Sequence, residues 1–212
     1  MARRYADLPP CPNLAFEQAL WKAGVRLVAG IDEAGRGPLA GPVAAAAVIL
    51  PVDPQGEERL QGVRDSKQMS PSARQAARLR IIEAVQAWGV GFASAQEIDE
   101  LGILPATRLA AQRAMDGLAV YPEYLLLDYL FLRESSLPQT SLIKGDCRSL
   151  SIAAASVLAK TARDAVMLEL DAQYPGYGLA AHKGYGTVAH RQAIRLLGPC
   201  PIHRRSFALL GK

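Results

Sequence analysis

The sequence predicts an α/β protein in which helices flank a mixed β-sheet, and two observations lead to this prediction. Short apolar runs typical of buried strands alternate along the chain with longer segments whose apolar residues recur every three or four positions. The chain also has 212 residues, of which 50% are hydrophobic, so it can fold around a core without disulfide bonds and is not disordered as a whole. We expect one domain over residues 26–212, preceded by an N-terminal lead-in over residues 1–25.

Five short apolar segments are the predicted strands. They are residues 26–31, 42–50, 90–95, 124–128 and 141–144. The first two are joined by a glycine-rich connection over residues 35–41, which is typical of a hairpin. Because this hairpin accompanies strands that alternate with helices, a mixed sheet is expected rather than a purely parallel one.

Four helices are predicted from residue spacing and from capping residues. Ser70 and Pro71 are a typical helix start, and apolar residues then recur at helical spacing as far as Trp88, with Gly89 as the predicted end. The other predicted helices span residues 105–118, 152–170 and 188–197. The apolar face of the third of these four helices consists largely of small residues, which indicates close packing against a flat surface.

The basic residues are concentrated towards the C-terminal end. Residues 172–212 contain six Lys or Arg, all three His and no Asp or Glu, whereas residues 1–171 have a formal net charge of −2. A basic segment on a slightly acidic body is typical of a protein that binds a polyanion such as nucleic acid. A solvated basic face would have the same composition and is the alternative.

The cysteines and the apolar runs indicate a soluble cytoplasmic protein. Cys11, Cys147 and Cys200 are odd in number and widely spaced, which fits reduced thiols and neither a disulfide framework nor a zinc motif. No apolar run approaches the roughly 18 residues of a membrane span, so no membrane partner is expected.

Acidic residues follow three of the predicted strands. Asp32, Asp128 and Asp146 each come directly after an apolar run or one glycine later. Strand ends in one small sheet can bring such side chains together, and their repulsion then requires a hard cation such as Mg²⁺ or Mn²⁺. Adjacent residues on a strand point to opposite faces, so Asp32 and Glu33 can share a metal only if the strand breaks there. Otherwise Glu33 could ligate through its backbone carbonyl or through water. The alternative is that each acid caps a helix or accepts loop N–H groups.

A glycine-rich turn follows the first pair of acids. In Gly35-Arg36-Gly37 the glycines allow the backbone to approach a ligand closely, and the guanidinium of the arginine can donate paired hydrogen bonds to a phosphate. The turn matches neither a Walker loop nor a dinucleotide fingerprint. An ordinary turn is the alternative, but its place next to Asp32 and Glu33 makes it a candidate for holding a nucleic-acid backbone beside a metal.

Together these segments resemble the motifs of the ribonuclease HII family. Residues 30–43, GIDEAGRGPLAGPV, resemble the first family motif, and Asp65-Ser66-Lys67 resembles the second. Further motifs are matched, in family order, by residues 144–146, 151–156, 161–164, 182–187 and 203–207. The resemblance covers about residues 26–207.

The resemblance implies a fold, a reaction and a set of catalytic residues. The fold is ribonuclease H-like, with a helical C-terminal extension. The reaction is hydrolysis of the RNA strand of RNA–DNA hybrids and incision 5′ of ribonucleotides embedded in duplex DNA. It leaves 3′-hydroxyl and 5′-phosphate ends and removes misincorporated ribonucleotides and RNA primers. Four acids, Asp32, Glu33, Asp128 and Asp146, would hold two divalent ions, Mn²⁺ or Mg²⁺.

The resemblance also implies the substrate contacts. The turn over residues 35–37 would read the 2′-hydroxyl, and Tyr185 would pack on the sugar beside the junction. His182 and His203 are expected to be structural or near phosphate rather than metal ligands. Phosphate contacts, or alternatively a solvated surface, are expected for Lys67, Lys144, Lys183 and Arg204.

The sequence departs from the family pattern after the third acid, where Tyr129 and Leu130 stand in place of the usual Gly-Asn pair. This departure keeps open a second class of function, a catalytically weak protein that binds RNA–DNA duplexes. The sister family ribonuclease HIII is a further alternative, but it normally has an additional N-terminal domain and lacks an arginine at the position of Arg36. We expect the protein to be a monomer.

Overall fold

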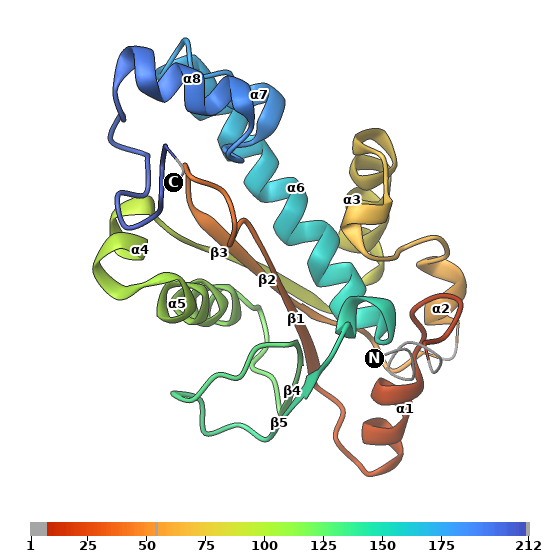
Figure 1. The fold of residues 1–212 in the computed structure, drawn as a ribbon. Coiled ribbons are helices and arrows are strands. Elements are labelled where there is room, and N and C mark those ends of the chain that lie inside the picture. Colours follow the sequence, from red (N-terminus) through yellow and green to blue (C-terminus); the bar gives the residue numbers. More distant parts are fainter. Residues whose placement is uncertain (1–7, 54, 211–212) are drawn as a thin grey trace.

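The computed structural model describes residues 8–53 and 55–210, and its centre is a five-stranded sheet (Figure 1). The strands are β1 (Val28–Ala34), β2 (Val43–Ile49), β3 (Ala87–Ala93), β4 (Tyr124–Asp128) and β5 (Gln139–Leu142). Their order in the sheet is β3-β2-β1-β4-β5; β2 pairs antiparallel with β1 and β3, whereas β4 pairs parallel with β1 and β5. The predicted α/β class, mixed sheet and first hairpin are confirmed.

Helix α6 (Leu150–Gln173) lies across one face of the sheet (Figure 1). Every residue of β2, whose sequence is VAAAAVI, is buried, so the middle of the sheet offers a surface of mostly small side chains. Gly30 of β1 allows close approach, because a Cβ atom there would lie 2.3 Å from the carbonyl carbon of Ser151. The predicted packing of a small-residue helix against a flat surface is confirmed.

Helix α5 (Ile103–Asp116) covers the opposite face and follows the short helix α4 (Ala95–Leu101). Strand β3 has glycines where α5 crosses it. A Cβ atom at Gly89 would lie 2.1 Å from the carbonyl oxygen of Ala114, and one at Gly91 would lie 2.2 Å from that of Ala110. These glycines are therefore required for the packing of α5 on the sheet.

Helix α3 (Pro71–Ala84) begins at the predicted residue but ends before the predicted one. Oγ of Ser70 accepts a hydrogen bond from the backbone N of Ala73 at 3.2 Å, as expected of an N-cap. The prediction that this helix continues to Trp88 is wrong, because Trp88 and Gly89 belong to β3. Gly89 allows close contact with α5 rather than ending a helix, and spacing along the chain does not reveal this.

The remaining helices in the described part of the chain are short. They are α1 (Ala15–Lys22), α2 (Gly56–Arg59), α7 (Leu179–His182), α8 (Val188–Leu197) and two 3-10 turns, Ser66–Gln68 and Gly145–Cys147. Helices α7 and α8 gather at the C-terminal end of α6 (Figure 1) and form the predicted helical C-terminal part, with α8 at its predicted bounds. Among the described helices, none is both long and apolar enough to cross a membrane.

Helix α1 is attached to the start of α6. Glu17 is buried, and its Oε1 accepts hydrogen bonds from Oγ of Ser149 at 2.6 Å and from Oγ and N of Ser151 at 2.6 and 3.0 Å. Asn13 also pairs with Ser149 in an isolated β-bridge. The part of the predicted lead-in around α1 is therefore packed onto the body of the protein.

Candidate active site

Three carboxylates meet where the parallel strands of the sheet end. Ile31 of β1 lies opposite Leu127 of β4, so Asp32 and Asp128 follow at the same level of the sheet. Asp146 lies in the 3-10 turn after β5, the next strand. One carboxylate oxygen from each of these three residues lies within 4.8 Å of the others. The structure thus brings together three of the four predicted catalytic acids.

The backbone around the cluster holds these side chains in place. Oδ1 of Asp128 accepts a hydrogen bond of 2.7 Å from the backbone N of Gly145, which joins the end of β4 to the turn that carries Asp146. Gly145 is closely packed there, because a Cβ atom would lie 2.7 Å from Cδ1 of Ile152 and 3.3 Å from Cα of Asp128. Asp32 is buried, at 4% exposed, on the central strand of the sheet.

The three carboxylates destabilise one another's charged forms. Burial raises the pKa of Asp32 well above its usual value, and the charges of Glu33 and Asp128 add to this, whereas a hydrogen bond from Ser156 opposes it. Burial also raises the pKa of Asp128, although a backbone hydrogen bond lowers it. Burial and then the charge of Asp128 raise the pKa of Asp146 to about 6. A divalent cation would relieve this repulsion, and oxygen ligands suit a hard ion.

Glu33 stands apart from the three aspartates. It follows Asp32 on β1, so the two side chains leave the strand in opposite directions, and among the described residues Glu33 is not in the three-carboxylate group. Nη1 of Arg36 donates a hydrogen bond to Oε1 of Glu33 at 3.1 Å. Oε2 of Glu33 is buried and has no hydrogen-bond partner among the described residues. A buried carboxylate oxygen without a partner fits a further metal ligand.

A groove of about 500 Å³ opens beside Glu33, the one of the four acids that lines it. Its lining includes the glycine-rich turn, Lys67 and Tyr185. Tyr185 is 45% exposed, and its Cε1 would lie 3.8 Å from a Cβ atom placed on Gly37. Burial lowers the pKa of Lys67, but the charge of Asp32 and of other acids outweighs burial, so the pKa is raised and the side chain stays cationic. The structure thus places a cation, an aromatic ring and the turn around one groove.

Lys183 and Lys144 lie outside the lining of this groove. Lys183 lines an adjoining hollow of about 560 Å³, which shares Lys160 and Tyr185 with the groove, and its Nζ donates a hydrogen bond to the carbonyl of Ala180. Lys144 has a left-handed backbone conformation with φ 54° immediately before the turn that carries Asp146. Phosphate contacts by these two lysines stay predictions.

Arg204 is in the interior, and the prediction that it contacts phosphate directly is wrong. Its side chain is 0% exposed, and the guanidinium donates hydrogen bonds to the carbonyl oxygens of Gly35, Arg36, Pro38 and Gly41 at 2.6–3.0 Å. Burial lowers the pKa of Arg204 to about 9. Arg204 therefore supports the glycine-rich turn from inside the protein. From one sequence without a structure, any arginine is predicted to lie at the surface, because charged residues are seldom fully buried.

Arg163 of α6 is a second buried arginine and was not among the predicted site residues. It is 1% exposed and donates hydrogen bonds to the carbonyl oxygens of Pro42, Lys183 and Ala40 at 2.9, 3.0 and 3.2 Å. Gly35, with φ +93°, passes so close that a Cβ atom would lie 1.9 Å from Nε of Arg163. Arg163 thus connects the turn to the loop that carries Lys183. In the sequence, Arg163 could have been recognised as a site residue from its position in the family motif over residues 161–164.

Asp65 is a further acid near the cluster that the sequence analysis did not select. Ligand atoms of Asp65, Asp146 and Cys147 lie within 4.8 Å of one another. Burial, followed by the charge of Asp146, raises the pKa of the Cys147 thiol to about 11. Asp65 also accepts a hydrogen bond of 2.9 Å from the backbone N of Lys67. It follows no apolar run, so only the Asp65-Ser66-Lys67 motif could have indicated it.

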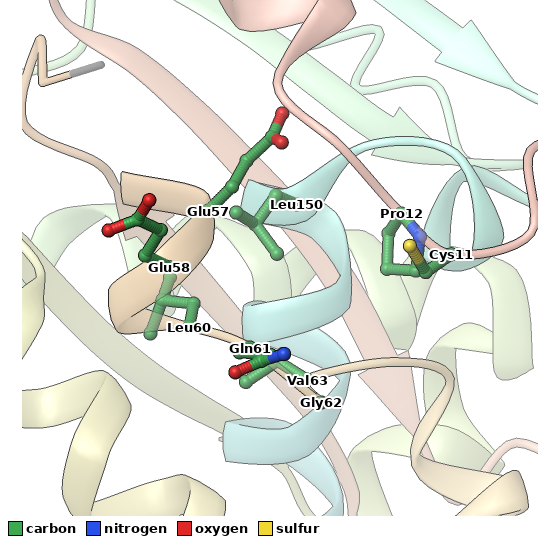
Figure 2. Close-up of a pocket in the computed structure, with 9 residues that line it drawn as sticks. All are labelled: Cys11, Pro12, Glu57, Glu58, Leu60, Gln61, Gly62, Val63 and Leu150. Carbon is green, nitrogen blue, oxygen red and sulfur yellow. The ribbon is translucent and has the colours of Figure 1, made fainter. Parts of the chain in front are cut away.

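Another hollow, of about 570 Å³, is shown in Figure 2 and is separate from this site. It lies between Cys11 and Pro12 of the N-terminal segment, helix α2 and Leu150 at the start of α6. Glu57 at its edge is already engaged, because its Oε1 accepts a hydrogen bond of 2.9 Å from the backbone N of Leu14. None of the four predicted catalytic acids lines this hollow.

Comparisons with known proteins concern the sequence and the fold as a whole. The model of the family Ribonuclease HII matches residues 29–210. The chain is 55% identical over 194 residues to Ribonuclease HII of Syntrophotalea carbinolica, covering 92% of this chain and 91% of that protein. It is 51% identical over 193 residues to Ribonuclease HII of Moorella thermoacetica, covering 91% and 92%. Its fold is similar to the crystal structure of ribonuclease H2 from Pyrococcus horikoshii OT3, with a TM-score of 0.70, 26% identity, and coverage of 86% of this chain and 94% of that one.

Proposed function

The chain belongs to the ribonuclease HII family and is a ribonuclease H that acts on RNA–DNA hybrids, and we propose that it also incises duplex DNA on the 5′ side of single embedded ribonucleotides. The products would carry 3′-hydroxyl and 5′-phosphate ends. The observation that carries the proposal is the convergence of Asp32, Asp128 and Asp146 within 4.8 Å. Glu33, the residue after Asp32, lines a groove together with the glycine-rich turn.

We propose that the four acids hold two divalent cations, Mn²⁺ or Mg²⁺. When bound, such ions activate a water molecule and stabilise the leaving 3′-oxygen in an in-line displacement. Asp32, Asp128 and Asp146 each offer an oxygen to a common ion, and the buried Oε2 of Glu33 offers another. The unpartnered oxygen of Glu33 supports ligation through its side chain, directly or through water.

We propose that the groove recognises the 2′-hydroxyl of the substrate. Because this mechanism needs no attacking 2′-hydroxyl, that group is free to be recognised. The backbone of the turn, held from inside by Arg204 and Arg163, can approach the sugar because residues 35 and 37 are glycines. Tyr185 offers a flat apolar surface to the neighbouring sugar, and Lys67 offers a cation to the phosphate.

The cellular role that fits this activity is the removal of misincorporated ribonucleotides and RNA primers. We place this role in the cytoplasm, where thiols stay reduced, and Cys11, Cys147 and Cys200 are all free thiols in the structure. We further propose that the protein acts as a monomer on RNA–DNA hybrids and on ribonucleotide-containing DNA.

An assay on DNA with one embedded ribonucleotide tests the proposal. The wild type should cut on the 5′ side of the ribonucleotide with Mn²⁺ or Mg²⁺. Asp32→Asn should lower the cutting rate by about 100-fold or more while duplex binding is kept, because it removes a carboxylate from the cluster. Asp116→Asn, an exposed substitution at the end of α5, is the matched control and should cut at the wild-type rate.

Two outcomes would contradict the proposal. Cutting by Asp32→Asn at the wild-type rate would show that the metal assignment is wrong. Tight binding of the junction duplex by the wild type without any cutting would instead favour the alternative of a catalytically weak duplex-binding protein.

A further inference from the structure

The loop that carries Tyr185 is connected to the segment around His203 by a row of hydrogen bonds through two buried histidines. The backbone N of Cys200 lies 3.0 Å from Nδ1 of His203. Nε2 of His203 lies 3.1 Å from Nε2 of His190, and Nδ1 of His190 lies 2.9 Å from the carbonyl oxygen of Tyr185. His190 and His203 are 0% and 1% exposed, so water does not compete for these bonds.

One placement of protons satisfies the whole row when both rings are neutral. The N–H of Cys200 can only donate, so Nδ1 of His203 accepts and the ring carries its proton on Nε2. Nε2 of His190 therefore accepts from His203, and Nδ1–H of His190 donates to the carbonyl of Tyr185, which can only accept. Burial lowers the pKa of His190 to about 4 and also lowers that of His203, so both rings are neutral at pH 7.

The reverse placement is less favourable. It would let Nδ1 of His203 donate to the carbonyl oxygen of Cys200 at 3.3 Å, or to Sγ of Cys200, a weak acceptor, at 3.1 Å. It would also set that proton against the N–H of Cys200 and leave the carbonyl of Tyr185 facing an unprotonated nitrogen of His190. The reverse placement would thus gain one hydrogen bond but lose two and leave an unfavourable contact in place of each lost bond.

His182 holds the same loop from within. Nδ1 of His182 accepts from the backbone N of Gly184 at 3.2 Å, so its Nε2–H donates to the carbonyl of Tyr177 at 2.8 Å. The His182 ring stacks on the His190 ring with a centroid separation of 4.3 Å. Two charged side chains also bond this loop: Arg163 donates to the carbonyl of Lys183 at 3.0 Å, and Arg191 donates to the carbonyl of Gly186 at 3.2 Å.

We propose that His190 and His203 are positioning residues for Tyr185 and, through its ring, determine how strongly the enzyme prefers a ribonucleotide junction. This inference rests on the proposed role of Tyr185 in the groove. The ring of Tyr185 lies beside Gly37, and the carbonyl of Gly184 accepts a backbone hydrogen bond of 2.8 Å from Leu39, two residues after that turn. A shift of the Tyr185 backbone would therefore move its ring relative to the turn.

A matched pair of amide substitutions separates the two ends of the His190 ring. His190→Asn places an amide N–H near the position of Nδ1 and keeps the bond to Tyr185, whereas His190→Gln reaches the position of Nε2, keeps the contact with His203 and loses that bond. The measurement is kcat/KM with Mn²⁺ on DNA with one ribonucleotide and on a uniform RNA–DNA hybrid. The ratio of the two values is the junction preference.

The two variants should differ in this ratio. We expect His190→Gln to lower the junction preference about fivefold, the effect of losing one hydrogen bond, and His190→Asn to keep it within about twofold of the wild type. An unchanged preference in His190→Gln, or an equal loss in both variants, would overturn the proposal.

A double-variant cycle tests whether His190 acts through Tyr185. In a Tyr185→Ala background, His190→Gln should change the junction preference by less than about twofold, because the ring that it positions is gone. The same fivefold loss in both backgrounds would show that His190 has a general structural role and would overturn the proposal.

A measurement on the wild type does not depend on the folding of any variant. Nitrogen-15 NMR of the imidazoles at pH 7 should show His203 protonated at Nε2 and His190 at Nδ1. The opposite tautomers would overturn this inference and leave the proposed function intact. Failure of the wild type to cut the junction substrate would instead contradict the proposed function.

Discussion

The guanidinium groups of Arg163 and Arg204 lie beneath the glycine-rich turn and bind backbone carbonyl oxygens. A planar group with five N–H donors can reach several carbonyls in different directions, whereas the ammonium group of lysine cannot. A buried carbonyl that loses its donor costs about 1–3 kcal/mol. The shape of the turn therefore depends on arginine at these two positions and not only on positive charge.

Arg204→Lys should destabilise the protein and impair cutting. We expect the free energy of unfolding to fall by about 2–4 kcal/mol, because several of the four carbonyl contacts are lost in the interior. Urea denaturation measures this loss. Arg205→Lys changes the exposed neighbouring residue in the same way and should stay within about 0.5 kcal/mol of the wild type. Equal stability of the two variants would refute the supporting role of Arg204.

Gly35→Ala should lower the free energy of unfolding by more than the strain of a left-handed backbone alone would. Gly35 has φ +93° and lies against Arg163, whereas Gly24 has φ +92° and nothing within 4 Å of its Cβ position. Gly24→Ala should therefore cost about 1–2 kcal/mol from the left-handed backbone, and Gly35→Ala should cost clearly more and lower the cutting rate. Thermal unfolding and the junction assay compare the two variants. Equal losses of stability would show that the contact with Arg163 has no effect.

The sequence allowed some site residues to be predicted and not others, for physical reasons. Asp128 and Asp146 could be proposed because an acid after an apolar run marks a strand end, and they lie at the end of β4 and after β5. The same reasoning selected Asp32, but the predicted strand end at residue 31 is wrong, because β1 continues to Ala34 and pairs there with β2. The burial of Arg204 could not be predicted, because it depends on carbonyl oxygens more than 160 positions away in the chain. Asp65 has no strand before it and was missed for that reason.

Helices α4 and α5 are joined by an ion pair that includes a helix cap. Oγ of Ser94 accepts from the N of Glu97 at 3.1 Å, and Oε2 of Glu97 accepts from the N of Ser94 at 2.8 Å, which forms a capping box. Nη2 of Arg113 on α5 lies 2.7 Å from Oε1 of Glu97. The hydrogen bond from Arg113, followed by the bond from Ser94, lowers the pKa of Glu97 to about 2.

The pKa of Glu97 predicts how stability depends on pH. Its usual pKa is 4.5, so as the pH falls from about 4.5 to 2 the unfolded chain binds the proton first and the folded state loses the stabilisation. We expect a loss of about 1 kcal/mol, since the pair is partly exposed. Unfolding free energies of the wild type and Glu97→Gln should differ above pH 4.5 and converge near pH 2. A constant difference across this range would contradict the prediction.

Elements with a strong local signal were predicted best. Strand β2 and helix α8 have clear boundary residues. Pro42 and Pro51 flank the strand, Gly198 follows the helix, and both elements lie where predicted. The end of α3 was misplaced, because Gly89 is needed for a contact with α5 that is remote in sequence. Helix α4 was missed, because the predicted strand over residues 90–95 overlapped its capping residue.

The whole molecule should be more stable with a divalent cation. Three carboxylates from different chain segments repel one another, so an ion that binds only the folded state adds to its stability. Mn²⁺ at about 100 times its Kd should add about 2.7 kcal/mol and raise Tm by roughly 5–10 °C. The gain should grow as the pH rises through 6, where Asp146 ionises. The rise in Tm is measured by thermal unfolding with Mn²⁺ and then with EDTA.

Asp146→Asn provides the comparison for this prediction. It removes one of the three carboxylates and should abolish most of the Mn²⁺-induced rise in Tm, whereas Asp116→Asn should keep it. An equal rise in both variants would show that the ion stabilises the protein at some other place.

The hydrogen bonds of Arg204 also have a consequence for synthesis on the ribosome. The turn over residues 35–41 is translated long before Arg204, which is separated from it by 163–169 positions. A nascent chain can therefore contain all four acids and still lack the side chain that supports this turn from inside. Selective cutting at ribonucleotides should accordingly begin only after the segment around residue 204 has left the exit tunnel and docked.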